Sequence, residues 1–193
     1  MWAIMMVAPS GQERGIAMLY NVAQLLKEGV GATRRYQVSD PVEYPAEGWA
    51  KVTPQGTVSL LRTPQGLLVQ AKLELSIPEQ CGRCLEPFSQ ALVADIEEEF
   101  LPVADVNTGV PLEVPRDEDV FTMDDRHMLD LTEALRQAII LARPMQPLCR
   151  PACAGLCPNC GRDLNQGACD CAQAPGDPRW AGLNDLLNER RAG

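Results

Sequence analysis

The sequence predicts an α+β fold, with an antiparallel β-sheet core, a few flanking helices and a C-terminal cysteine-rich segment. Three observations lead to this prediction. Apolar and polar residues alternate over residues 67–77, which is the period-2 pattern of a strand with one buried face. Apolar residues recur at helical spacing over residues 131–142. Eight cysteines lie at only two places in a chain of 193 residues.

Three parts are expected along the chain. Residues 1–17 show neither helical nor strand periodicity and are expected to be an extension, with Met18 as an alternative start. Residues 18–148 are expected to form the α+β core domain. Residues 149–193 are expected to form the cysteine-rich segment, which ends in a helix.

The first predicted element is a short helix. Within residues 21–26, Val22, Leu25 and Leu26 recur at helical spacing. Glycines follow directly and end the pattern, so one or two helical turns are expected.

The segment 48–101 has the pattern of strands. The motif Thr-Pro-Gln-Gly occurs at 53–56 and again at 63–66, where Pro fixes a negative φ and Gly permits a positive one. Each copy predicts a tight turn, with a strand over 57–62 between them. Residues 88–101 are expected to pair antiparallel with the alternating strand. The side chains predicted to face the core are Leu67, Val69, Ala71, Leu73, Leu75, Ile77, Leu92, Ala94 and Ile96.

Acidic residues are concentrated in one segment. Residues 95–125 contain 11 acidic residues and one basic residue, whereas the rest of the chain contains 15 acidic and 16 basic residues. Within this segment, residues 102–119 lack periodicity and are expected to form a solvated loop. A protein that binds nucleic acid mainly through phosphates carries a basic excess, so the net charge of −9 argues against a broad nucleic-acid-binding face.

Two further helices are predicted. The pattern over 131–142 follows Asp130 as N-cap, has Glu133 as its capping-box partner and ends before Pro144. A last helix is expected to begin at Asp177, followed by a proline at its first position. The apolar residues that this last helix is expected to bury are Trp180, Leu183 and Leu187.

Nothing in the sequence indicates a membrane segment. No stretch reaches the roughly 18 apolar residues that a membrane-spanning helix requires. The apolar residues 1–8 end at Pro9 and have no basic residue before them, unlike a signal peptide. We therefore expect a cytoplasmic protein without membrane contact.

The cysteine spacing is the pattern that a metal ion requires. Two thiolates separated by two residues around a tight turn can bind one ion at about 2.3 Å, and two such pairs complete a tetrahedral zinc site of the knuckle or ribbon type. Gly82, Gly155, Gly161 and Gly167 lie among the cysteines and are expected to supply positive φ angles. The eight predicted ligands are Cys81, Cys84, Cys149, Cys153, Cys157, Cys160, Cys169 and Cys171.

Two structural Zn²⁺ sites can be assembled from these cysteines. The four cysteines of residues 157–171 are close in sequence and are expected to form a small ribbon. Cys149 and Cys153 then remain to join Cys81 and Cys84, which lie in the turn between the two long strands. The second site would connect the C-terminal segment to the sheet across roughly 65 residues.

Other cysteine chemistries are less well supported. A disulfide framework needs an oxidising compartment, for which the sequence has no export signal. Four thiolates also bind iron, although knuckle-like spacing favours zinc. Cys81 and Cys84 have the spacing of a redox pair, but such pairs begin a helix, and these residues lie in a strand turn.

No catalytic constellation is recognised. His127 is the single histidine and is expected at the surface. No Ser/His/Asp set can be built around it, and no glycine-rich phosphate loop follows a strand. The protein is therefore expected not to be an enzyme and to have no small-molecule substrate.

Short motifs occur in a specific order along the chain: Asn21–Glu28, Thr33–Tyr36, Cys81–Leu85, Asp130–Glu133, Pro144–Met145, Leu148–Cys149, Gly155–Gly161 and Asp177–Trp180. Together they resemble the YceD family, whose members are described as large ribosomal RNA subunit accumulation proteins. The similarity covers about residues 18–188. The ordered set is specific, although each motif alone is weak.

The resemblance implies a non-enzymatic factor that supports the accumulation of large-subunit ribosomal RNA, without implying a mechanism. Its partner is expected to be the precursor RNA, a ribosomal protein or another maturation factor. Two Zn²⁺ with eight thiolates add negative charge, so a protein with a basic surface is preferred. A zinc-ribbon adapter unrelated to the ribosome is the alternative. The candidate residues for contact with RNA or a partner are Arg34, Arg35, Tyr36, Arg150 and Arg162. The alternative for each arginine is a solvated surface position without a partner.

Overall fold

The computed structural model describes residues 18–115 and 120–171. The predicted extension 1–17 and the predicted helix from Asp177 lie outside these residues. The described chain is α+β, as predicted, with a mainly antiparallel sheet and two α-helices.

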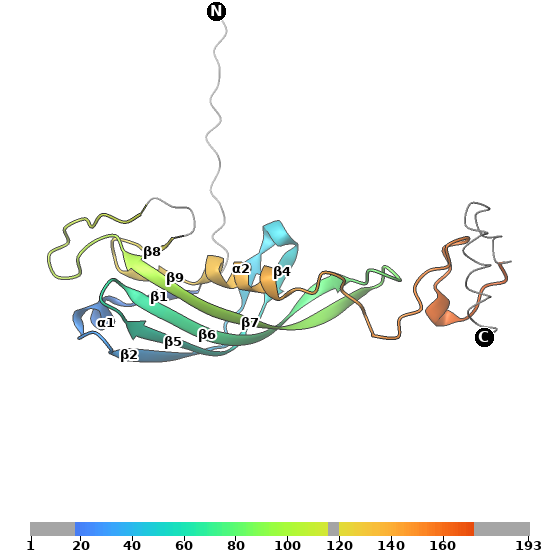
Figure 1. Cartoon of the computed structure of the whole chain (residues 1–193), viewed down its shortest axis with the longest axis horizontal. Helices are drawn as coiled ribbons and strands as arrows, with labels where there is room; N and C mark the ends of the chain where they lie inside the picture. The colour runs from blue at the N-terminus through green and yellow to red at the C-terminus, as the bar shows by residue number, and fades with distance from the viewer. Residues whose placement is uncertain (1–17, 116–119, 172–193) are drawn as a thin grey trace, which may run out of the picture.

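A curved five-stranded sheet forms the centre of the described chain, in the order β2-β5-β6-β7-β8 (Figure 1). β6 pairs antiparallel with β7 along the whole of β6 and forms a long hairpin with it, which confirms the predicted pairing. β8 instead pairs parallel with β7, so the sheet is not purely antiparallel. The strands are β2 (Thr33–Val38), β5 (Gln55–Arg62), β6 (Leu67–Gln80), β7 (Pro87–Pro102) and β8 (Phe121–Met123).

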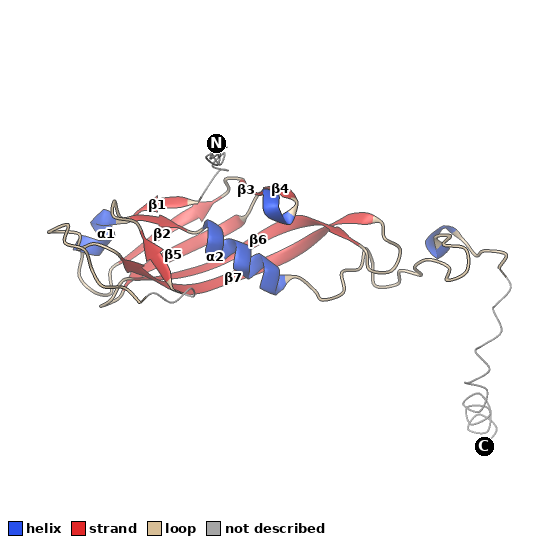
Figure 2. Cartoon of the chain, turned by 90° about the horizontal axis from the view of Figure 1, so that it is seen from above, coloured by secondary structure: helices blue, strands red, loops and turns tan. Residues whose placement is uncertain are grey.

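One face of this sheet is covered by the remaining elements (Figures 1 and 2). The helix α2 packs against β7, and two small antiparallel strand pairs, β1 with β9 and β3 with β4, lie on the same side. These elements are β1 (Leu19–Asn21), α1 (Ala23–Lys27), β3 (Val42–Tyr44), a 3-10 helix (Pro45–Glu47), β4 (Trp49–Val52), β9 (Met128–Asp130) and α2 (Thr132–Ala142).

The core lies between the sheet and this covering layer. All nine side chains predicted to face inward from β6 and β7 are buried, and the alternate residues Gln70, Lys72 and Glu74 are exposed. Leu135 and Ile139 of α2 are completely buried against the sheet. Burying a side chain of this size stabilises the fold by roughly 1.5–3 kcal/mol. The alternation of apolar and polar residues along β6 and β7 therefore determines which face of the hairpin packs against the core.

Hydrogen bonds and an ion pair hold α2 in place. The Tyr44 hydroxyl donates to the carbonyl oxygen of Thr132 over 3.0 Å. Arg143, directly after α2, pairs with the largely buried carboxylate of Glu79 at 2.5 Å and lies 5.7 Å from the Trp49 ring centroid. These contacts fix the direction in which the chain leaves α2 toward the cysteine-rich segment.

One prediction for the strand region needs correction, and several strands were missed. The first Thr-Pro-Gln-Gly motif is not a tight turn, because Gln55 and Gly56 belong to β5 and pair with β6. Pro54 is buried where the chain passes from one sheet to another. The second motif does connect β5 to β6, and Gly66 is required there by close packing, since a Cβ atom would lie 2.1 Å from the carbonyl oxygen of Phe100. Strands β1, β2, β3, β8 and β9 were not predicted.

The start of α2 also differs from prediction. The N-cap residue is Leu131, although the Asp130 carboxylate still accepts from the Thr132 backbone N–H over 2.8 Å. Glu133 does not complete a capping box, because its carboxylate pairs with Arg136. This ion pair and the adjacent Gln137 bond lower the pKa of Glu133.

The predicted acidic loop is largely confirmed within the described residues. Pro102 still belongs to β7, whereas 103–115 form no strand and are held by one bridge between Ala104 and Pro111. The remainder of the predicted loop, residues 116–119, lies outside the described residues.

Candidate metal centres

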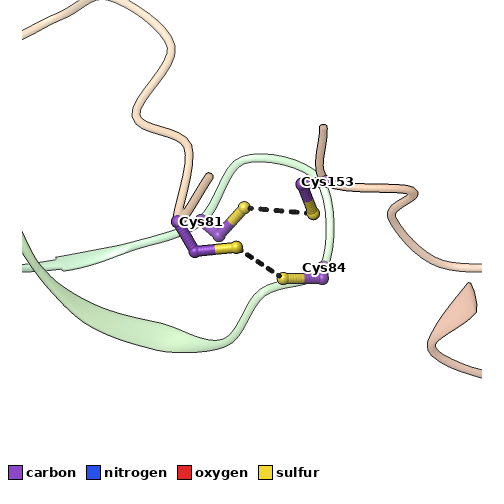
Figure 3. A group of neighbouring side chains, drawn as sticks. Cys81, Cys84 and Cys153 are labelled. Atoms are coloured by element: carbon purple, nitrogen blue, oxygen red, sulfur yellow. Dashed lines mark hydrogen bonds between the residues drawn. The ribbon is translucent and has the colours of Figure 1, made fainter. Parts of the chain in front are cut away.

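The first cysteine group, site 1, lies at the tip of the β6–β7 hairpin. Cys81 and Cys84 come from the hairpin turn, and Cys149 and Cys153 come from the segment after α2. The four sulfur atoms all lie within 4.8 Å of one another, with 3.8 Å between those of Cys81 and Cys153 and 3.7 Å between those of Cys84 and Cys149. In Figure 3 the labelled side chains of Cys81, Cys84 and Cys153 point toward one another.

Backbone contacts hold the two parts of site 1 together. The Gly82 N–H donates to the Pro147 carbonyl oxygen over 2.8 Å, and the Leu156 N–H donates to the Arg83 carbonyl oxygen over 3.2 Å. The Arg83 guanidinium donates to the Cys153 carbonyl oxygen over 2.9 Å. The C-terminal segment is thus fastened to the hairpin turn on both sides of Cys153.

The second group, site 2, is local in sequence. Its ligand candidates all lie within 15 residues, and their sulfur atoms again lie within 4.8 Å of one another, with 3.3 Å between Cys157 and Cys169. A short bridge between Leu156 and Asp163 closes the loop that begins the site. Cys160 is exposed, so site 2 is more open to solvent than site 1. Its four cysteines are Cys157, Cys160, Cys169 and Cys171.

The same knuckle turn occurs in both sites. The Leu85 N–H donates to the Cys81 carbonyl oxygen over 3.0 Å, and the Gly161 N–H donates to the Cys157 carbonyl oxygen over 2.9 Å. Both residues after the second cysteine have a positive φ, 61° at Leu85 and 73° at Gly161. The predicted positive φ at Gly82 is therefore wrong, since Leu85 has it instead. At Gly155, Gly161 and Gly167 the prediction is confirmed.

The sulfur distances fit a four-thiolate metal site. Four sulfurs at about 2.3 Å from one ion, at the corners of a tetrahedron, lie about 3.8 Å apart. A disulfide needs about 2.05 Å, and all eight cysteines are free. The predicted grouping of the eight cysteines into two sets of four is the grouping in the structure.

The local environment divides each group into low-pKa and high-pKa thiols. Backbone N–H groups near the sulfur, with that of Cys149 the strongest, lower the pKa of Cys81 to about 6. The N–H groups of Cys160 and Asn159 do the same for Cys157, also to about 6. Burial, followed by the neighbouring thiols, raises the pKa of Cys149 to about 12. In both sites backbone N–H groups stabilise one thiolate, and burial together with the neighbouring sulfurs opposes further ionisation unless a cation is present.

The candidate contact residues on β2 lie away from both sites. Arg34 forms an ion pair with Glu28, and Arg35 is exposed on the edge strand. Tyr36 is half-buried and its ring centroid lies 4.9 Å from that of Tyr20. Figure 1 places β2 at the end of the molecule opposite the cysteine-rich segment, so the five candidate residues do not form one surface.

The other two candidates lie within the cysteine-rich segment. Arg162 is exposed, and Arg150 donates to the Asn165 side-chain oxygen over 2.6 Å. Asn165 was not predicted as a site residue, and no spacing signal marks it. His127, predicted at the surface, is half-buried, and its Nδ1 atom is buried without a hydrogen-bond partner.

The family described as "Large ribosomal RNA subunit accumulation protein YceD" matches residues 69–187, which include all eight cysteines. The chain belongs to the YceD family. This confirms the resemblance seen in the sequence motifs.

Similar curated proteins include uncharacterized proteins of Mycobacterium bovis and Mycobacterium tuberculosis, each 32% identical over 129 residues, which are 64% of this YceD-family chain and 56% of the relative. The chain therefore spans little more than half the length of these relatives. A protein of Arabidopsis thaliana named "Large ribosomal RNA subunit accumulation protein YCED homolog 1, chloroplastic" is 30% identical over 61 residues, 32% of this chain and 19% of that protein. No solved structure matches the chain significantly.

Within the described part of the chain, no helix has the length and apolar character needed to cross a membrane.

Proposed function

We propose that this protein is a non-enzymatic, cytoplasmic assembly factor that supports the accumulation or maturation of large-subunit ribosomal RNA. The observation that carries the proposal is membership of the YceD family over 69–187, together with the name of the Arabidopsis relative. The same match covers the hairpin, α2 and both cysteine groups, so the proposed role uses the folded body described above.

We further propose that each cysteine group binds one structural Zn²⁺. Sulfur spacings of 3.7 and 3.8 Å in site 1 support this, because they equal the edge of a tetrahedral zinc–thiolate site. Four protein ligands leave no open coordination position, so the metal would stabilise structure and would not bind a substrate. Zinc bound at site 1 would fasten the C-terminal segment to the hairpin tip.

The proposed partner is a basic surface of a ribosomal protein or of another maturation factor. On the exposed face of β7, Asp95, Glu97 and Glu99 recur at every second residue, and the acidic loop follows at the end of this strand. Such a surface repels RNA phosphates and attracts lysine and arginine side chains. The candidate RNA contacts at Arg34 and Arg35 are the opposing possibility.

A complementation experiment tests this function. A strain lacking the gene is expected to contain less large-subunit ribosomal RNA relative to the small-subunit RNA, and the intact gene should restore the ratio. The double variant with Asp95→Lys and Glu97→Lys should not restore the ratio, although it should fold normally because both side chains are exposed. The control double variant with Arg34→Ala and Arg35→Ala should restore the ratio. A deletion strain with a normal RNA ratio would refute the proposal. Restoration by the lysine variant and failure of the arginine variant would assign the contact to RNA.

A salt-resistant pull-down identifies the partner directly. The tagged, zinc-loaded chain is expected to retain large-subunit proteins or maturation factors, with precursor RNA, after washing at high salt. Capture of RNA polymerase or an unrelated complex, without ribosomal components, would instead indicate a zinc-ribbon adapter outside the ribosome.

A further inference from the structure

Asn165 connects the two cysteine groups. It lies in a 3-10 helix (Leu164–Gln166) within the loop that joins Cys160 to Cys169, the loop of site 2. Its side-chain nitrogen, however, lies 3.4 Å from the sulfur atom of Cys153, a member of site 1. One side chain therefore belongs to the ligand loop of one site and contacts a sulfur atom of the other.

The orientation of the Asn165 amide is fixed by its neighbours. Its oxygen accepts from the Ala154 N–H over 2.9 Å and from the Arg150 guanidinium over 2.6 Å. Its nitrogen donates to the Asp163 carboxylate over 2.6 Å. Two donors surround the oxygen and two acceptors surround the nitrogen, so the nitrogen must face the Cys153 sulfur.

The position of Asn165 depends on the site 2 loop being closed. The Leu164 N–H donates to the Gly155 carbonyl oxygen over 2.8 Å, and the Cys157 N–H donates to the Arg162 carbonyl oxygen over 2.8 Å. These bonds attach residues 162 and 164 of the loop to residues 155 and 157, which precede Cys160. A metal ion bound by Cys157, Cys160 and Cys169 would also close the rest of the loop, and so order the residues on both sides of Asn165.

We infer that Asn165 couples the two metal sites, so that a metal ion in either site raises the affinity of the other. This inference rests on the proposed binding of metal at both cysteine groups. When site 2 is filled, the loop presents the Asn165 N–H to the Cys153 thiolate and offsets its negative charge. Hydrogen-bond donors to metal ligands typically change metal affinity by about 10- to 100-fold. Because coupling between two binding sites is reciprocal, filling site 1 raises the affinity of site 2 by the same factor.

Titration of the full chain with Co²⁺ tests the coupling, because sulfur-to-cobalt absorption reports each four-thiolate site. Cys169→Ser removes site 2, and the affinity of site 1 should fall about 10-fold or more. With site 2 intact, Asn165→Ala should lower the affinity of site 1 by about as much as Cys169→Ser does. The double variant, Asn165→Ala with Cys169→Ser, should show no further loss of site 1 affinity. The absorption band of site 1 should also shift in Asn165→Ala, because one thiolate loses its donor.

Two further variants separate coupling from loop stability. Asn165→Asp keeps an oxygen acceptor for Ala154 and Arg150 but places a carboxylate against the sulfur, so it should weaken site 1 at least as much as alanine does. Gln166→Ala, a change in the same 3-10 helix that touches no sulfur, should leave site 1 unchanged.

Equal site 1 affinity with and without Cys169, or additive losses in the double variant, would overturn the coupling while leaving two metal sites in place. A chain that binds no metal at all would overturn both this inference and the zinc part of the proposed function.

Discussion

The two metal sites should respond differently to unfolding of the sheet. Site 1 joins Cys84 to Cys149, which are 65 residues apart in sequence, whereas in site 2 Cys160 and Cys169 are only nine apart. In the native protein the hairpin and α2 bring the site 1 ligands together. Urea removes this support, and site 1 then depends on closure of a long flexible loop.

The difference follows from loop-closure entropy. Closing a loop of n residues costs about (3/2)RT ln n, which is about 3.7 kcal/mol for the long loop of site 1 and about 1.9 kcal/mol for the short loop of site 2. Both sites have four thiolates, so the remaining binding terms are similar. In the unfolded chain, site 1 should therefore bind Zn²⁺ about 20-fold more weakly than site 2.

A urea titration with a coloured zinc chelator measures this difference. One zinc ion is expected to leave as the sheet unfolds, monitored by circular dichroism, and the other should remain until the chelator concentration is raised about 20-fold. Cys84→Ser should bind one zinc ion that persists in urea. Cys169→Ser should bind one that is released with the sheet.

Several results would refute this reasoning. Loss of both zinc ions, or of neither, in Cys84→Ser at saturating zinc would show that the ligands are not paired as in the structure. Release of both ions at one chelator concentration in urea would show that loop length does not control affinity.

Three stability predictions follow from the packing of the core and can be checked by equilibrium urea unfolding. Gly66→Ala should lower the free energy of unfolding by about 3 kcal/mol, because its Cβ would overlap a backbone oxygen. The control Gly109→Ala has open space around its Cβ and a φ of 71°, so it should lower that free energy by only about 1 kcal/mol. Equal losses would contradict the packing argument. Arg143→Ala should cost about 2 kcal/mol by leaving the Glu79 carboxylate unpaired, and adding Glu79→Gln should recover about half; no recovery would exclude the charge explanation. Tyr44→Phe should cost about 1 kcal/mol through loss of its bond to α2, and an unchanged midpoint would show that this bond contributes nothing.

The sequence predicted those features that depend on local periodicity or spacing. Alternation over β6 determined its buried face, because a strand places every second side chain on the same side. The cysteine spacing predicted the local group of site 2, because ligands in one knuckle must be close in sequence, and the four cysteines that remained gave site 1.

Features that depend on tertiary contacts were not predictable in this way. β2 is an edge strand whose arginines are exposed on both faces, so it shows no alternation. β8 and β9 are three residues each, too short for a pattern. Leu85 has a left-handed backbone, which leucine ordinarily avoids. The knuckle turn imposes this conformation, and Gly161 has it at the corresponding position of site 2. The contact of Asn165 with Cys153 exists only once two loops are folded together.

The length of the β6–β7 hairpin sets a distance between the two ends of the protein. Its first strand has 14 residues, which span about 45 Å at about 3.3 Å per residue. The acidic loop lies at one end of this span and the cysteine-rich segment at the other (Figure 1). The acidic loop and the cysteine-rich segment are therefore separated by about the length of the hairpin. Adding two residues to each strand would lengthen the hairpin by about 7 Å while keeping every side chain on its original face.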